Sequence, residues 1–146
     1  MENKKSNSET LSEIYRNAQL ALQSISDILP EIEDGAIKEE IRRQHEEYEK
    51  ICSSAALLAR ANGQELKEPG AIKKAMMWSS IKMSTMSDNS TQHIADMMIQ
   101  GTVMGITSLK KTQSHSNGLL DGEVNALLEE LISLEESFEQ RLKAFL

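Results

Sequence analysis

Apolar residues recur at alternating steps of four and three through four segments of this chain, and this spacing is the strongest constraint on its fold. A stripe with this spacing runs along one face of an α-helix, because each turn takes 3.6 residues. The segments are residues 10–32, 36–61, 90–115 and 121–146. Each predicted helix must cover its apolar face with another element. The chain is therefore predicted to be all-α.

The composition favours the same fold class. Of the 146 residues, 39% are apolar, but only 3% are aromatic and two are proline. Strands are enriched in aromatic and β-branched residues, so this balance favours helices. A chain of this length fits one domain. We expect residues 1–8, which are mostly polar, to be disordered or frayed, and residues 9–146 to form a single helical domain.

Charge and cysteine content limit the partners and the compartment. Sixteen basic and twenty-three acidic residues leave a formal charge of −7, which repels nucleic acid and anionic membrane surfaces. Cys52 is the only cysteine, so no disulfide forms within one chain. The N-terminal residues lack the apolar core of a signal peptide, and no stretch has the length of a membrane span. We expect a soluble cytoplasmic protein without a nucleic-acid or membrane partner.

The connections between the four segments differ in length. Asp34-Gly35 joins the first two segments tightly, which predicts antiparallel neighbours. Residues 62–89 form a long crossover that includes a short amphipathic helix, and such a crossover makes the second and third main helices parallel. A polar loop at residues 114–122 joins the last two segments tightly.

Two stripes in the second half of the chain carry unusual residues. In the crossover, an inward stripe is predicted through Ile72, Met76, Ser79 and Met83, within a methionine-rich region. In the third main segment, the predicted inward stripe contains two glycines one turn apart. Its members are Ile94, Met98, Gly101, Gly105 and Ser108. We expect the glycine pair to allow another helix backbone to approach closely.

The helix order resembles that of the ferritin-like four-helix bundles. The stretch from Met83 to Ser90, followed by residues 93–101, is similar to sequences of a small, uncharacterised bacterial branch of that superfamily. The likeness covers about residues 9–146 and follows helix order rather than a catalytic signature. It implies a ferritin-like four-helix bundle with a short extra helix in the long crossover between the second and third main helices.

The same resemblance implies where a metal site would lie. Metal-binding members supply one Glu from each of two helices and a Glu-x-x-His motif from each of the other two. At the matching positions this chain keeps one carboxylate and no histidine; the positions are Gln19, Gln44, Gln100, Glu135 and Phe138. Two hard cations need several carboxylates and imidazoles. The resemblance therefore implies a degenerate site with no metal and no other cofactor.

Glu135 occupies a position of the last stripe where an apolar residue is expected, between Leu131 and Phe138. A buried carboxylate needs donors, a cation or a proton. Gln44 interrupts the second stripe in the same way, and Tyr48 lies one turn further along it. We predict a buried polar core of Gln44, Tyr48 and Glu135, in which Gln44 pairs with Glu135. This pair either sets helix register or marks an adapted small-ligand site.

No pattern in the sequence assigns a specific activity, and a non-enzymatic role is favoured. The preferred hypothesis is a metal-free bundle that acts as a structural or interaction protein, with self-association through a helix face as the candidate partnership. A first alternative is a variant metal-binding oxidoreductase that uses Glu135 with His45 or His93. A second is a small-molecule-binding bundle in which the methionine-rich crossover covers a cavity next to Trp78.

Overall fold

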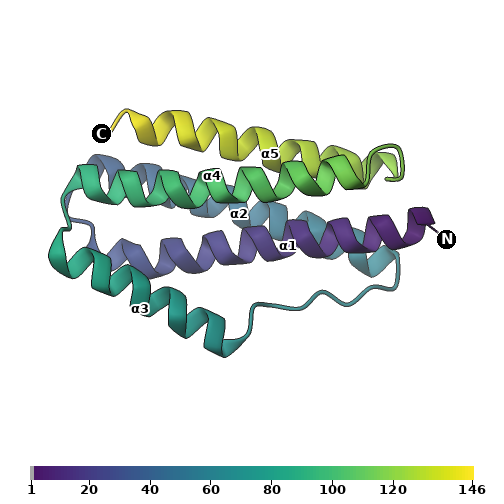
Figure 1. Cartoon of the computed structure of the whole chain (residues 1–146), viewed down its shortest axis with the longest axis horizontal. Helices are drawn as coiled ribbons and strands as arrows, with labels where there is room; N and C mark the ends of the chain where they lie inside the picture. The colour runs from purple at the N-terminus through teal and green to yellow at the C-terminus, as the bar shows by residue number, and fades with distance from the viewer. Residues whose placement is uncertain (1) are drawn as a thin grey trace.

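The computed structural model describes residues 2–146, and every regular element in that range is helical (Figure 1). The prediction of an all-α chain is confirmed. The elements are α1 (Glu2–Ile28), a short 3₁₀ turn (Leu29–Glu31), α2 (Gly35–Ala61), α3 (Ala71–Ser87), α4 (Thr91–His115) and α5 (Gly122–Lys143).

Four long helices lie side by side, and α3 lies along one side of them (Figure 1). The most extensive contacts join α1 to α2 and α4 to α5, which are the pairs with short connections. Each pair is antiparallel, whereas α2 and α4 run in the same direction because the chain crosses over between them (Figure 1). In the crossover, residues 62–70 form an extended loop and α3 packs mainly against α1.

The predicted stripes of α1, α2 and α5 form most of the core. The side chains that are fully excluded from solvent include Leu11, Ile14, Ala18, Ile25, Ile28, Ile37, Ile41, Ala55, Leu128, Leu131, Phe138 and Leu142. Each buried Leu, Ile or Phe contributes about 1.5–3 kcal/mol relative to an exposed one. Each of these helices therefore turns its predicted apolar face toward the centre of the bundle.

The predicted stripe of α4 is wrong by about one residue. The structure buries Thr102, Ile106 and Leu109 of this helix, whereas Gly101 is exposed and Gly105 is half-buried. The more apolar side chains face α5, and the face that carries the two glycines is turned toward α1 and α3. The small residues therefore lie beside a gap rather than at a close contact between helices.

The predicted stripe of α3 is also wrong in direction. Ile72, Met76 and Met83 are 80%, 68% and 73% exposed, while Ile81 and Thr85 point inward. The reason is that α3 packs on one side only. Its stripe shows that the helix is amphipathic, but the face that meets the bundle is the opposite one.

The first helix begins at Glu2, ahead of the residue-9 boundary that the sequence predicts. Two long-range contacts hold its first turns. The Oδ1 of Asn7, a side chain only 6% exposed, accepts a hydrogen bond of 2.8 Å from the Asp121 backbone N–H. The Ser8 carbonyl accepts another of 2.8 Å from Gln64 Nε2. The described part of the segment expected to be frayed is thus helical and tied to two loops.

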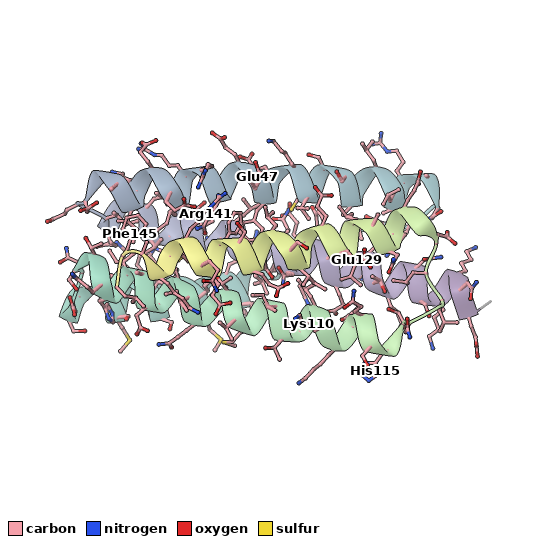
Figure 2. All side chains as sticks on the ribbon, turned by 90° about the horizontal axis from the view of Figure 1, so that it is seen from above. Glu47, Lys110, His115, Glu129, Arg141 and Phe145 are labelled. Atoms are coloured by element: carbon pink, nitrogen blue, oxygen red, sulfur yellow. The ribbon has the colours of Figure 1, made fainter. Side chains whose placement is uncertain are left out.

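The outer faces carry the charged side chains, as Figure 2 shows for Glu129, Lys110 and Arg141. Ion pairs between neighbouring helices are few and exposed; the Lys110–Glu136 pair spans 3.6 Å between α4 and α5. Such exposed pairs contribute less than about 1 kcal/mol each. Within residues 2–146, no helix combines the length and the apolar character that crossing a membrane requires.

Candidate functional site: a cavity that ends at a buried glutamate

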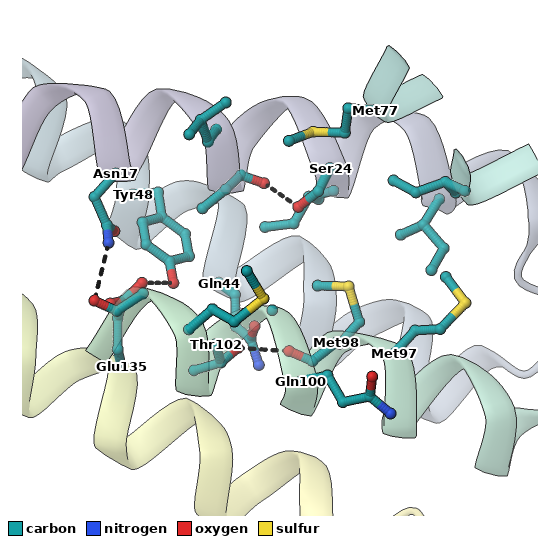
Figure 3. A pocket seen from close by; sticks show the side chains of 18 of the residues that line it. Asn17, Ser24, Gln44, Tyr48, Met77, Met97, Met98, Gln100, Thr102 and Glu135 are labelled. Carbon is teal, nitrogen blue, oxygen red and sulfur yellow. Dashed lines mark hydrogen bonds between the residues drawn. The ribbon is translucent and has the colours of Figure 1, made fainter. Parts of the chain in front are cut away.

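A cavity of about 670 Å³ lies between α1, α3 and α4, with residues of α2 and α5 at its inner end (Figure 3). Four methionines line it: Met77 from α3 and Met97, Met98 and Met104 from α4. Small residues on the facing sides of α1 and α4 also line it, namely Ala21, Ser24, Gly101, Gly105 and Ser108. Because these side chains are small, they leave space that leucine side chains at the same positions would fill.

Glu135 lies at the inner end of the cavity and is only 2% exposed. Its Oε2 accepts a hydrogen bond of 2.6 Å from the hydroxyl of Tyr48, a side chain that is itself 3% exposed (Figure 3). The Tyr48 ring packs edge to face on Phe138, with 5.4 Å between ring centroids and 60° between planes. Phe138 thus holds the tyrosine that donates to the carboxyl group.

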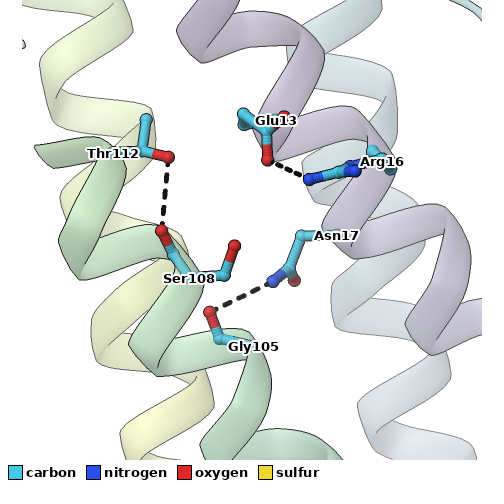
Figure 4. A network of polar contacts seen from close by, with 6 residues as sticks. All are labelled: Glu13, Arg16, Asn17, Gly105, Ser108 and Thr112. Carbon is cyan, nitrogen blue, oxygen red and sulfur yellow. Dashed lines mark hydrogen bonds and ion pairs between the residues drawn. The ribbon is translucent and has the colours of Figure 1, made fainter. Parts of the chain in front are cut away.

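Asn17 and Gly105 complete the surroundings of this carboxyl group. Asn17 Nδ2 donates a long hydrogen bond of 3.4 Å to the Gly105 carbonyl (Figure 4). A Cβ atom at residue 105 would lie 2.9 Å and 3.1 Å from the two Glu135 carboxyl oxygens and 3.0 Å from Asn17 Nδ2. The first separation is shorter than real Cβ contacts, and the other two are tighter than most. A side chain at position 105 would therefore make the ends of Glu135 and Asn17 shift.

Two oxygen atoms in this cluster have no hydrogen-bond donor. They are Glu135 Oε1 and Asn17 Oδ1, and both are buried from solvent. A buried polar atom without a partner costs about 1–3 kcal/mol, and more when it carries charge. The cluster is therefore short of donors, and the shortage lies where Glu135 and Asn17 line the cavity.

Burial raises the pKa of Glu135 from its ordinary 4.5 to about 7. The hydrogen bond from Tyr48 and the nearby Asn17 amide act in the opposite direction but do not offset the loss of hydration. Burial, together with the nearby Glu135, raises the pKa of Tyr48 well above its ordinary value, so its hydroxyl stays a donor. Near neutral pH the carboxyl group is therefore present in both its protonated and its ionised form.

The predicted polar core lies in the interior, but its hydrogen bonds differ from those predicted. Gln44 is 1% exposed, and its Nε2 donates to Glu40 Oε2 on the same helix at 3.1 Å. Tyr48 rather than Gln44 is the partner of Glu135. The sequence signal for Tyr48 is its place one turn after Gln44 on the same stripe. A hydroxyl on a ring reaches further across the interior than the shorter amide of Gln44.

Of the remaining positions of the implied ligand pattern, Gln19 and Gln100 do not lie around Glu135. Gln19 Nε2 faces the Cys52 sulfur at 3.6 Å, on the side where α1 meets α2. Gln100 is exposed at the rim of the cavity, and its Nε2 donates to Asp96 Oδ2 at 3.0 Å. Phe138 is fully buried.

The two histidines of the oxidoreductase hypothesis lie elsewhere. His45, 30% exposed, contacts Glu49 one turn along its own helix, with 2.9 Å between Nδ1 and Oε1. His93 Nε2 lies 2.8 Å from Ser84 Oγ, where α3 meets α4. Neither residue lines the cavity. Among residues 2–146, no three His, Cys, Asp or Glu side chains are grouped closely enough to hold a metal ion.

Sequence reasoning missed Asn17 and the role of Gly105. Asn17 lies beside Ala18, on the flank of its stripe, where a polar residue is ordinary. Gly105 belongs to the recognised glycine pair, but its neighbours are side-chain atoms of Glu135 and Asn17 rather than a helix backbone. Only the packing of α4 against α1 and α5 brings these groups together.

Comparison with known proteins finds no match to this chain, whether with family models, curated proteins or solved structures. The functional conclusion therefore depends on the geometry of the site itself.

The raised pKa of Glu135 predicts how stability changes with pH. Between pH 4.5 and about 7 the folded protein keeps a proton that the unfolded chain has lost. This contribution to stability is full below pH 4.5, declines as pH rises to about 7, and is absent above it. At 1.4 kcal/mol per pH unit, the total change from pH 4.5 to 7 is about 3 kcal/mol.

Urea unfolding of the native protein and of Glu135→Gln at several pH values measures this contribution. The stability of the native protein relative to the variant should fall as pH rises through this range. Glu130→Gln, at an exposed position on the same helix, serves as the control and should show no such trend. A difference between native protein and Glu135→Gln that does not vary with pH would contradict the burial of an ionisable carboxyl.

The two glycines of α4 offer a second, matched test. Gly101→Ala adds a methyl group that meets no atom within 4 Å, so it should stabilise the protein by about 0.5–1 kcal/mol through helix propensity. Gly105→Ala displaces the Glu135 carboxyl and should destabilise the protein by about 1–2 kcal/mol. Thermal and urea unfolding measure both changes, and equal stabilisation by the two substitutions would rule out the close packing at Gly105.

Proposed function

We propose that this protein is a non-enzymatic bundle that binds a small, largely apolar molecule in the cavity between α1, α3 and α4. The supporting observation is a cavity of about 670 Å³ that ends at a buried carboxyl group with one oxygen lacking a donor. Ligand pockets typically measure about 300–1,000 Å³ and combine apolar walls with a few polar groups. Both properties are present here.

The size of the cavity separates it from ordinary packing gaps. Protein interiors are packed as densely as organic crystals, with few voids larger than a water molecule. The methionines on its walls are flexible and polarisable, and such side chains adapt to ligands of different shape. One of them is reached from solvent, since Met104 is 73% exposed. A site with these walls favours an apolar ligand body.

The crossover helix α3 supplies the cover in this proposal. Its Met77, Ile81 and Ser84 line the cavity. It is held by few polar contacts, among them Lys82 with Glu31 and Ser84 with His93. Trp78, beside which the sequence hypothesis placed the cavity, is half-exposed and points elsewhere, but its neighbour Met77 is a wall residue. Movement of α3 away from α1 would open the site.

The proposed architecture is that of a ferritin-like bundle whose metal-ligand positions are no longer occupied by ligand residues. Its support is the order of two antiparallel helix pairs with a crossover between them. The oxidoreductase alternative receives no support from the site, because His45 and His93 bond to other partners. A cytoplasmic location remains part of the proposal. Cys52 fits it as a buried free thiol whose pKa burial raises to about 11.

Binding of a neutral solvatochromic dye, Nile red, tests the proposal. The native protein should bind it saturably, with a blue shift of its emission. Ser24→Phe fills the cavity from α1 and should weaken binding by about tenfold or more, since the ring displaces the ligand. Ser26→Phe makes the same change at an exposed position two residues away and should bind as the native protein does. Unsaturable dye binding, or equal binding by both variants, would refute the cavity site.

A second candidate function is self-association, and one observation favours it. Ile72, Met76, Met83 and Met86 are 80%, 68%, 73% and 85% exposed and form one stripe along α3. An apolar face of this kind is what two helices use to pair, and a second copy of the chain presents the same face.

Sedimentation equilibrium of the native protein and of the double variant Met76→Glu, Met83→Glu tests this candidate. A dimer in the native protein that the double variant converts to a monomer would support it. Thr107→Glu, at an exposed position on α4, should leave the dimer unchanged. A native protein that stays monomeric at high concentration would exclude this role.

A further inference from the structure

The inner end of the cavity offers hydrogen-bond acceptors in excess of donors. Glu135 Oε1 and Asn17 Oδ1 are both buried and both lack a donor. The two donors that form hydrogen bonds in this cluster are the Tyr48 hydroxyl, which bonds to Glu135 Oε2, and the Asn17 amide, which reaches the Gly105 carbonyl. Gln44 does not add one, because its Nε2 donates to Glu40. A ligand that complements this end must therefore bring N–H or O–H groups.

Glu135 and Asn17 meet beside Gly105. Glu135 Oε1 lies 2.9 Å and Asn17 Nδ2 3.0 Å from the point that a Gly105 Cβ would occupy, so the carboxyl group fills the space that this glycine leaves. Both side chains also line the cavity, so a ligand in it meets the carboxyl group at its inner end.

We propose that the cavity binds a primary amine with an apolar tail, and that its ammonium group pairs with Glu135 and Asn17. This inference rests on the proposed binding function and names the chemical class of its ligand. An ammonium group carries three donors and no acceptor, whereas a hydroxyl carries one donor and adds two lone pairs. Of these two groups, only the ammonium group matches a cluster that lacks donors alone.

Charge favours the same ligand class. Pairing with a cation offsets the cost of burying an ionised carboxylate, and charge-assisted hydrogen bonds are about twice as strong as neutral ones. An anionic head group would meet the carboxylate and add further acceptors. The methionine-lined walls would contact the tail of the ligand.

The other ionisable groups around the cavity do not supply the donors that Glu135 lacks. On α1, Arg16 is paired with Glu13. On α3, Lys73 is exposed to solvent, where its charge is screened. On α2, the Tyr48 hydroxyl is already bound to Glu135. The α4 residues that line the cavity include no ionisable side chain. Within residues 2–146, Glu135 is thus the one buried carboxyl group that faces the ligand space.

Calorimetric titration with n-hexylamine and 1-hexanol tests the proposal, because the two probes share a tail and differ in the head group. The native protein should bind hexylammonium at least about tenfold more tightly than hexanol, the gain expected of a charge-assisted hydrogen bond. In Glu135→Gln this preference should disappear while hexanol still binds. Glu130→Gln, an exposed control on α5, should keep the preference.

A second measurement uses the native protein alone and so does not depend on a variant that folds. The ammonium group and a proton on Glu135 occupy the same oxygen, so hexylamine binding at pH 7 should release protons and hexanol binding should release none. Titrations in buffers of different ionisation enthalpy count these protons. Hexylamine binding to the native protein at pH 7 that releases no protons would overturn the pairing.

The outcomes separate this inference from the function on which it rests. If hexanol binds the native protein as tightly as hexylamine, the amine assignment is wrong but the cavity remains a binding site for neutral apolar molecules. If neither probe binds and Nile red also fails to bind saturably, the proposed function itself is wrong. A tenfold preference that is lost only in Glu135→Gln supports both.

Discussion

The burial of the Glu135 carboxyl group is the constraint on which the rest of the site depends. Removing a carboxylate from water costs several kcal/mol unless donors, a cation or a proton compensate. The protein supplies one short hydrogen bond, from Tyr48, and orients that tyrosine by packing its ring on Phe138. It then leaves Oε1 without a donor. Burial, which this hydrogen bond offsets only in part, raises the pKa of the group to about 7 and keeps the site responsive to a proton or a ligand.

Periodicity predicted the core-facing sides of α1, α2 and α5 because each of these helices is covered along its whole apolar stripe. It failed for α4, where glycines stand at positions that fit the stripe but have no side chain to bury. It failed for α3 because an apolar stripe shows that a helix has two different faces, but not which of them packs on the bundle. The early start of α1 depends on the Asn7–Asp121 contact, which joins residues far apart in the chain.

The sequence predicted which polar residues are buried in the site, but not which of them form hydrogen bonds with one another. A carboxylate, an amide and a tyrosine on apolar stripes indicated a buried polar core, and Gln44, Tyr48 and Glu135 are all buried. Which of them form hydrogen bonds depends on side-chain reach and rotamer, and these are settled only when the helices pack. Gln44 finds Glu40 one turn away on its own helix, a local bond that competes with any partner across the interior.

The residues of α4 whose orientation the periodicity predicted wrongly are also residues that form the cavity. Gly101 and Gly105 lower helix propensity by about 1 kcal/mol each, and an orphaned buried oxygen costs about 1–3 kcal/mol more. A bundle selected for stability alone would fill this space with leucine and replace Glu135 with an apolar residue. Glycines within a helix and an unpaired buried oxygen at the same place are expected where a protein gives up stability for binding. A ligand that fills the space and donates to Glu135 would recover both losses at once, because apolar contact and the missing hydrogen bond are supplied by the same molecule.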